Sequence, residues 1–167
     1  MSPNVATKTQ VSASDATFGQ GITFSTGVGF NIAVSPDRKA FTADFSGLEA
    51  IINGQAGSAS PIATRTFSFA IPLSGTTPGE EIPFFVTGFV LNETGANAHL
   101  VFSVNDQTLV TDFPPGSDNE FVQQLKYKAG DATEARITVF LLADRDSKSN
   151  AGVHVNVTAI DTDVLKH

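Results

Sequence analysis

The chain has no cysteine and no tryptophan, and it has one tyrosine and one methionine among its 167 residues. The absence of cysteine excludes disulfide bonds, thiolate metal sites and cysteine nucleophiles. Sandwich proteins that bind sugars often stack the sugar ring on an exposed tryptophan or tyrosine, because these rings combine an apolar face with a polar edge. The composition therefore argues against a lectin that works by ring stacking.

Basic residues are also scarce. Ten lysines and arginines stand against seventeen aspartates and glutamates, so the formal net charge is −7, and basic residues form no run. This excludes a nucleic-acid partner, which needs a basic stripe, and disfavours an anionic membrane surface. No segment approaches the ~18 apolar residues of a membrane span. The N-terminus lacks the apolar stretch of a signal peptide, and the sequence assigns no compartment.

The chain is instead rich in valine, isoleucine, threonine and phenylalanine, with fourteen phenylalanines. These residues favour a pleated, half-buried surface, so we expect an all-β fold. The clearest element is a β-hairpin over residues 98–113, in which apolar and polar side chains alternate on both arms and residues 105–107 supply a turn. Because alternating segments flank it on both sides, we expect this hairpin to lie at the centre of the fold.

Further strands follow from the same alternation. Residues 28–45 predict a second hairpin, and residues 67–73 place four apolar side chains on one face. Gly88, inside an apolar strand, marks a bulge or a close backbone approach. Residues 137–142 are apolar on both faces, which predicts a central strand covered on both sides. Residues 48–52 fit one helical turn or a strand equally well.

These segments amount to about eight or nine short strands separated by turns. An antiparallel two-sheet β-sandwich of Greek-key or jelly-roll type fits this pattern best, and a closed β-barrel is the alternative. We expect an N-terminal arm over residues 1–20 and a single β-sandwich domain over residues 21–167. Residues 4–14 of the arm alternate weakly, so part of the arm is either an edge strand or a free tail.

Three segments resemble an uncharacterised family of secreted β-rich proteins of fungi and bacteria. They are VSPDRKAFTADFSGLEA at residues 34–50, two strands around a Pro-Gly loop at residues 65–90, and the loop TDFPPGSDNEF at residues 111–121. Members typically carry paired cysteines, which this chain lacks. The resemblance implies a secreted β-sandwich. It implies no site residues, because the family has no established activity.

The loop that begins at Asp144 is a candidate calcium site. Asp144, Asp146 and Asn150 place oxygen ligands at the spacing of a calcium loop. Lys148, however, stands where another ligand oxygen is needed. The alternative is therefore a solvated hairpin loop with local ion pairs.

Two other polar groups are weaker candidates. Residues 118–120 would form an acidic cluster with Asp131 and Glu134 if their loops met at one end of the sandwich. His99 and His154, if they lay on adjacent strands, would bind a metal as jelly-roll oxygenases do with two histidines and a carboxylate. The alternative is that both histidines are simply exposed on their strands.

The sequence thus favours a non-catalytic structural or binding module. A homo-oligomer built through the N-terminal arm or through an apolar sheet face is one form of this hypothesis, because open sheet edges tend to pair with other chains. A calcium-dependent, lectin-like sandwich and a metal-dependent jelly-roll enzyme using His99 and His154 are the alternatives. No residue pattern identifies a glycan or other small-molecule ligand.

Overall fold

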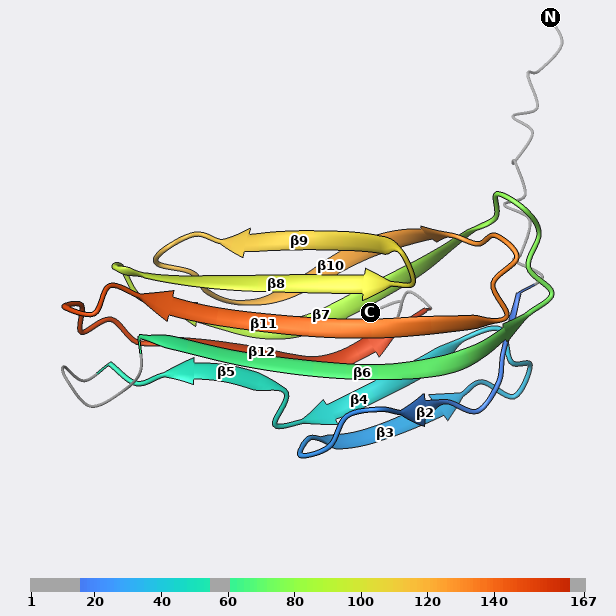
Figure 1. Ribbon diagram of the computed structural model, residues 1–167, viewed down its shortest axis with the longest axis horizontal. Helices are drawn as coiled ribbons and strands as arrows, with labels where there is room; N and C mark the ends of the chain where they lie inside the picture. The colour runs from blue at the N-terminus through green and yellow to red at the C-terminus, as the bar shows by residue number, and fades with distance from the viewer. Residues whose placement is uncertain (1–15, 55–60, 163–167) are drawn as a thin grey trace, which may run out of the picture.

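The computed structural model describes residues 16–54 and 61–162, which form two packed antiparallel β-sheets (Figure 1). Within these ranges no helix has the length and apolar character that a membrane crossing requires. The strands are β1 (Thr17–Phe18), β2 (Ile22–Thr23), β3 (Gly29–Val34), β4 (Phe41–Ser46), β5 (Glu49–Ile52), β6 (Ile62–Ser74), β7 (Glu81–Asn92), β8 (Ala96–Val104), β9 (Gln107–Phe113), β10 (Asp118–Lys128), β11 (Glu134–Arg145) and β12 (Val153–Asp161).

The strand order is that of a jelly roll. One sheet has the order β1-β6-β11-β8-β9, with β2 also on β6, and the other has the order β10-β7-β12-β4-β3, with β5 also on β12. The chain passes from one sheet to the other along β5, β6, β7 and β8, and again along β9, β10, β11 and β12. These two Greek keys make the predicted sandwich. Both sheets end in edge strands, so the alternative of a closed barrel is not supported.

The core explains the abundance of phenylalanine. The four inward apolar residues of β6 between Phe67 and Leu73 are buried, as the alternation predicted. Phe67 and Phe69 lie against Phe30 with ring centroids 5.1 Å apart in each case. Phe41 links this group to Phe84, with ring centroids 6.0 Å apart. Rings at such distances in tilted and edge-on orientations gain attraction beyond their buried area. One end of the sandwich is therefore held by an aromatic cluster.

Both predicted hairpins are present. In the β3–β4 hairpin, the Ser35 hydroxyl donates to Asp37 Oδ1 at 2.6 Å, which is the main cause that lowers the pKa of Asp37 from its usual value. The β8–β9 hairpin closes through a two-residue turn whose first residue, Asn105, has a φ of +52°. The β8–β9 hairpin is not central, however. β9 is an edge strand, and the middle of its sheet is β11.

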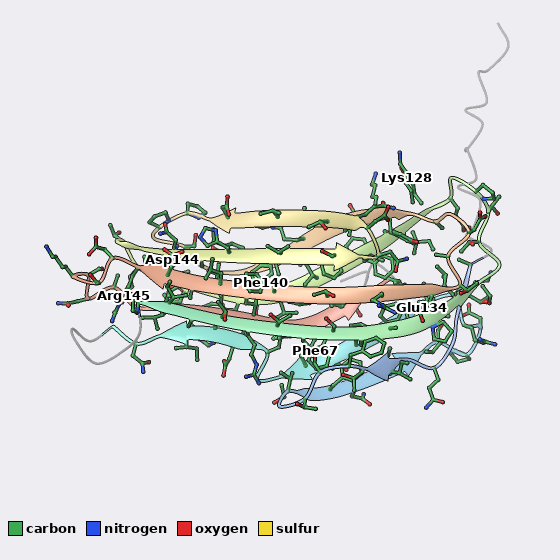
Figure 2. All side chains as sticks on the ribbon, viewed as in Figure 1. Phe67, Lys128, Glu134, Phe140, Asp144 and Arg145 are labelled. Atoms are coloured by element: carbon green, nitrogen blue, oxygen red, sulfur yellow. The ribbon has the colours of Figure 1, made fainter. Side chains whose placement is uncertain are left out.

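The prediction for β11 is half right. The strand is central, between β6 and β8, and its inward face is buried. Phe140 and Leu142 on the outward face are only half-buried. Figure 2 shows Phe140 with no described strand in front of it. Outward apolar residues on a central strand gain shelter from the neighbouring strands alone. Apolar residues on both faces of β11 therefore correctly predicted its central position in the sheet. They do not indicate a further layer of structure that covers the outward face.

Two local expectations are settled in the second sheet. Gly88 lies where β12 bulges between Val157 and Ala159, and a Cβ atom built on Gly88 would stand 2.0 Å from the Asn156 carbonyl oxygen. The predicted close backbone approach is confirmed. The ambiguous residues 48–52 contain a strand, β5. It pairs with the first half of β12, and β4 pairs with the second half.

The N-terminal boundary of the domain differs from the expected one. β1 and its pairing with β6 fall inside the stretch assigned to an arm over residues 1–20, and Phe18 is buried in the core. The sandwich therefore already includes Ala16, which is also buried. Residues 4–14, the expected edge strand, lie outside the described residues.

Candidate functional site

A polar cleft of about 430 Å³ lies at one end of the sandwich. It forms where the β8–β9 turn, the end of β10 and the β10–β11 connection meet, and Lys128 and Glu134 mark this end on the right of Figure 2. Its lining consists of residues 105–107, Tyr127, Lys128 and residues 130–134. A volume of this size is within the range of small-ligand pockets.

Asn105 fixes the geometry of this end. Its Nδ2 donates to the Tyr127 hydroxyl at 2.7 Å and to the Glu134 carbonyl oxygen at 3.1 Å, and its Oδ1 accepts from the Arg136 amide at 2.8 Å. Asparagine tolerates the left-handed φ of this position better than most residues do. One turn residue thus joins β8, β10 and β11.

Gln107 joins the two sheets at the same end. Its Nε2 donates to the Lys128 carbonyl oxygen at 3.0 Å, and its Oε1 accepts from the Lys128 amide at 2.9 Å. The Gln107 side chain on β9 therefore satisfies both backbone groups of Lys128 on β10, the edge strand of the opposite sheet. This pair of bonds holds Lys128 at the cleft in a fixed backbone position.

Tyr127 contributes the buried polar group of the cleft. The residue is 2% exposed, and its ring packs edge-on against Phe84 with centroids 6.1 Å apart. Its hydroxyl accepts from Asn105, and in the described part of the chain no acceptor is recorded for the hydroxyl hydrogen. A phenol also donates a hydrogen bond. The hydroxyl hydrogen is therefore the one polar group of this lining side chain for which no partner is described.

The charges around the cleft are mostly negative. Asp106 and Asp131 carry exposed carboxylates, and Glu134 accepts from Arg136 at 3.0 Å. Lys128 is the basic residue in the lining. Because like charges repel and charged ligands are attracted by the opposite sign, this arrangement favours neutral or cationic ligands over anionic ones.

The candidate calcium residues lie at the opposite end of β11. Asp144 Oδ1 accepts from Asn97 Nδ2 at 2.9 Å, and its Oδ2 lies 3.3 Å from His99 Nε2. Asp146 Oδ1 accepts from the Lys148 amide at 2.8 Å. Residues 16–54 and 61–162 hold no cluster of three or more histidine, aspartate or glutamate side chains placed for a metal ion. A calcium site at Asp144, Asp146 and Asn150 stays a hypothesis, and the hydrogen bonds that Asp144 and Asp146 accept favour the alternative of a solvated hairpin loop.

We expect calcium at millimolar concentration to leave the Tm of the protein unchanged, because Asp144 and Asp146 already accept local hydrogen bonds. Thermal unfolding with calcium, and with a chelator as the reference, measures this directly. A ligand that binds the folded state raises the Tm by mass action. A rise with calcium that the D146N variant abolishes would establish the loop site and contradict this expectation.

The two candidate metal histidines do not meet. His99 is on β8 of one sheet and His154 is on β12 of the other, and each alternates with inward core residues. Their side chains therefore point outward from opposite faces of the sandwich, so the adjacent strands that a shared metal site requires are not present. His99 Nδ1 lies 2.6 Å from Asp112 Oδ1, and His154 Nε2 lies 2.8 Å from Glu49 Oε2.

The expected second acidic cluster does not form either. Asp118 begins β10, whereas Asp131 and Glu134 follow the end of that strand. A strand of 11 residues separates the two groups by roughly 33 Å, at about 3.3 Å per step. Asp131 and Glu134 line the cleft, and residues 118–120 lie at the far end of the strand.

The cleft itself was missed by sequence reasoning. Both of its loops carried turn signals, Asn105-Asp106 in one and Gly130-Asp131 in the other. These signals predict turns but give no information about which turns share an end of the sandwich. That placement follows from the pairing of β11 with both β6 and β8.

No protein-family model matches the chain, and no curated protein matches it. Two solved structures are similar to it in parts. The enzymatically active domain of tailspike protein 4 of bacteriophage CBA120 is 13% identical with a TM-score of 0.35, over 88% of this chain and 19% of the tailspike chain. TmCBM61, solved in complex with beta-1,4-galactotriose, is 11% identical with a TM-score of 0.31, over 78% of this chain and 86% of its own.

This chain spans less than a fifth of the tailspike chain that it matches. At these TM-scores, neither likeness carries an argument about function. The resemblance to a family of secreted β-rich proteins stays a prediction.

Proposed function

We propose that this chain is a non-catalytic binding module that takes a neutral, hydroxyl-rich ligand such as an oligosaccharide in the end cleft. The observation that carries the proposal is the convergence of polar side chains from three chain segments on one cleft of about 430 Å³. Concave sites with a few well-placed polar groups are the usual location of small-ligand binding.

The chemistry of the lining suits hydroxyl groups. A hydroxyl group both donates and accepts hydrogen bonds. The carboxylates of Asp106 and Asp131 accept, the Lys128 ammonium group donates, and the Tyr127 hydroxyl hydrogen is available to a ligand acceptor. Such a set can satisfy several neighbouring hydroxyls of one ligand. The lining offers no exposed aromatic platform, so hydrogen bonding and not ring stacking would select the ligand.

The framework beneath these groups is fixed before a ligand arrives. Asn105 ties the turn to β10 and β11, and Gln107 ties β9 to β10. Groups that are already held in position lose little conformational entropy on binding, which preserves affinity. This is the reason to place recognition in the cleft and not in a flatter part of the surface.

The distance between the cleft and the Asp144 loop separates this proposal from a calcium-dependent lectin. β11 runs from Glu134 at the cleft to Arg145 beside the loop, 12 residues in all, which is roughly 36 Å at about 3.3 Å per step. A calcium ion at Asp144 would therefore not touch a ligand in the cleft. Binding in the cleft is expected to be the same with calcium and with a chelator.

We expect the D131N variant to bind a neutral oligosaccharide at least about tenfold more weakly, because each charge-assisted hydrogen bond contributes about 1.5–3 kcal/mol. The test is a panel of neutral and uronic oligosaccharides, followed by calorimetry on the best ligand. The matched control is D118N, which changes another exposed aspartate at the far end of β10.

Equal binding by D131N and the unchanged protein would contradict the placement of the ligand in the cleft. A preference for uronic over neutral oligosaccharides would contradict the charge argument. No binding to any neutral oligosaccharide at millimolar concentration would contradict the proposal. Hydrolysis of a bound oligosaccharide would show that the protein is an enzyme and not a non-catalytic module.

A further inference from the structure

β9 is an edge strand with unpaired backbone groups. It pairs with β8 on one side, and Figure 1 shows no strand of its sheet beyond it on the other. Val104 and Gln107 flank the two-residue turn and so form a hydrogen-bonded pair. Hydrogen-bonded and non-hydrogen-bonded pairs alternate along an antiparallel hairpin. The backbone N–H and C=O groups of Leu109 and Thr111 therefore also point toward β8.

The backbone N–H and C=O groups of Thr108, Val110 and Asp112 therefore point away from the sheet. An independent bond supports this assignment. The Asn105 amide donates to the Arg136 carbonyl oxygen, which places the odd-numbered residues of β8 toward β11 and the even-numbered ones toward β9. Within residues 16–54 and 61–162, no recorded bond occupies the outward backbone groups of Thr108, Val110 and Asp112.

The β9 edge also lacks most of the features that usually prevent pairing between chains, and its one charged residue, Asp112, lies 2.6 Å from His99 on β8. Its seven residues contain no lysine and no proline, and their register with β8 has no bulge. The other edge strands differ: β1 and β2 have two residues each, β5 has four and begins with Glu49, and β10 carries Lys126 and Lys128. β3 is uncharged, but its outward side chains are Gly29, Asn31 and Ala33, which offer no large apolar group.

We propose that β9 pairs antiparallel with β9 of a second copy of this chain, across a two-fold axis at Val110. In this register Val110 lies opposite Val110, and Thr108 lies opposite Asp112 of the second copy. All three pairs join residues with free outward groups, so each forms the two bonds of a hydrogen-bonded antiparallel pair. The valine side chain, 61% exposed in one copy, becomes covered by its equivalent. The edge is thus complementary to itself, as a two-fold interface requires.

β10, which lies beneath β9 in the other sheet, is compatible with the same two-fold axis. Phe113 lies over Phe121 with ring centroids 4.7 Å apart, and Gln107 bonds to Lys128, so the middle of β9 lies over Gln124. Across an axis at Gln124, Glu120 faces Lys128 of the second copy. Opposite charges therefore meet at this side of the sandwich, even though each chain carries a net charge of −7.

The test is the mass of the full chain in solution, measured by light scattering and sedimentation over a range of concentrations. We expect a dimer, and we expect both V110K and V110P to raise its dissociation constant at least about tenfold. Lysine places a charge on the edge. Proline fixes φ at a value that edge strands tolerate, and it removes an N–H that no bond among the described residues uses. An unchanged Tm at a concentration where all variants are monomeric shows that the fold is intact.

The matched control is I62K, which changes a residue that is 55% exposed on β6, at the other side of the same sheet. A dimer that both Val110 variants weaken and I62K preserves supports the proposal. A protein that is monomeric at all concentrations overturns it, as does a dimer that V110P leaves unchanged. A dimer that I62K disrupts overturns it in favour of contact through the outer face of the sheet.

Discussion

Replacing Gly88 with alanine is expected to lower the free energy of unfolding by about 3 kcal/mol or more, at the upper end of the overpacking range. A Cβ atom at this position would lie 2.0 Å from the Asn156 carbonyl oxygen and 2.6 Å from Phe121 Cζ. The oxygen belongs to the backbone of β12 next to its bulge, so it cannot move as the end of a flexible side chain would. β7 and β12 would have to separate locally.

Urea unfolding of the full chain measures this effect, with G130A as the matched control. No atom lies within 4 Å of the position of a Cβ atom on Gly130, and its φ is not in the left-handed region. G130A is therefore expected to change the free energy of unfolding by no more than about 0.5 kcal/mol. Equal stability of G88A and G130A would show that the close approach of the two strands is not as described.

Replacing Asn105 with alanine is expected to lower the free energy of unfolding by about 4–5 kcal/mol. The substitution removes three side-chain hydrogen bonds, each of which contributes about 1 kcal/mol. It also places a residue with a Cβ atom and no local hydrogen bonding at a φ of +52°, which costs a further 1–2 kcal/mol or so. The loss should extend to the cleft, because the Tyr127 hydroxyl and the Arg136 amide lose their partner.

Two companion variants separate the causes. N105G loses the same hydrogen bonds but tolerates the positive φ, so we expect it to be roughly 1 kcal/mol more stable than N105A. N119A removes an exposed side chain whose recorded bond is to the neighbouring Glu120 carbonyl oxygen, and it should change stability by no more than about 0.5 kcal/mol. If N105G were as unstable as N105A, the positive φ would contribute nothing to the stability that N105A loses.

Alternation of apolar residues predicted most of the fold, because a sheet with one buried face requires it. The β3–β4 and β8–β9 hairpins, the inward face of β6 and the close approach at Gly88 all follow from local patterns. The two hairpins and the alternation of β6 depend on residues that are neighbours in sequence or directly opposite in a hairpin, whereas Gly88 indicated a close approach but not its partner, β12. The sandwich class follows in turn from the number and spacing of such strands.

Features that depend on strand order were not predictable in this way. The β8–β9 hairpin looks central because strands flank it in the sequence, but the jelly-roll order places β9 at an edge. Asp131 and Glu134 were grouped with residues 118–120, although the length of β10 separates them. The cleft arises from the meeting of three segments that are distant in the sequence, and no local pattern encodes that meeting.

The carboxamide of Gln107 presents one donor and one acceptor side by side to the backbone of Lys128. It thus supplies the two hydrogen bonds that a neighbouring strand on the open side of β10 would supply. An amide on an edge strand normally exchanges its hydrogen with solvent quickly, but the Lys128 amide is bonded as an interior one is. Its hydrogen-exchange protection therefore depends on a single side chain and not on the sheet. One backbone amide thus reports, at residue resolution, whether β9 and β10 are joined at the wall of the cleft.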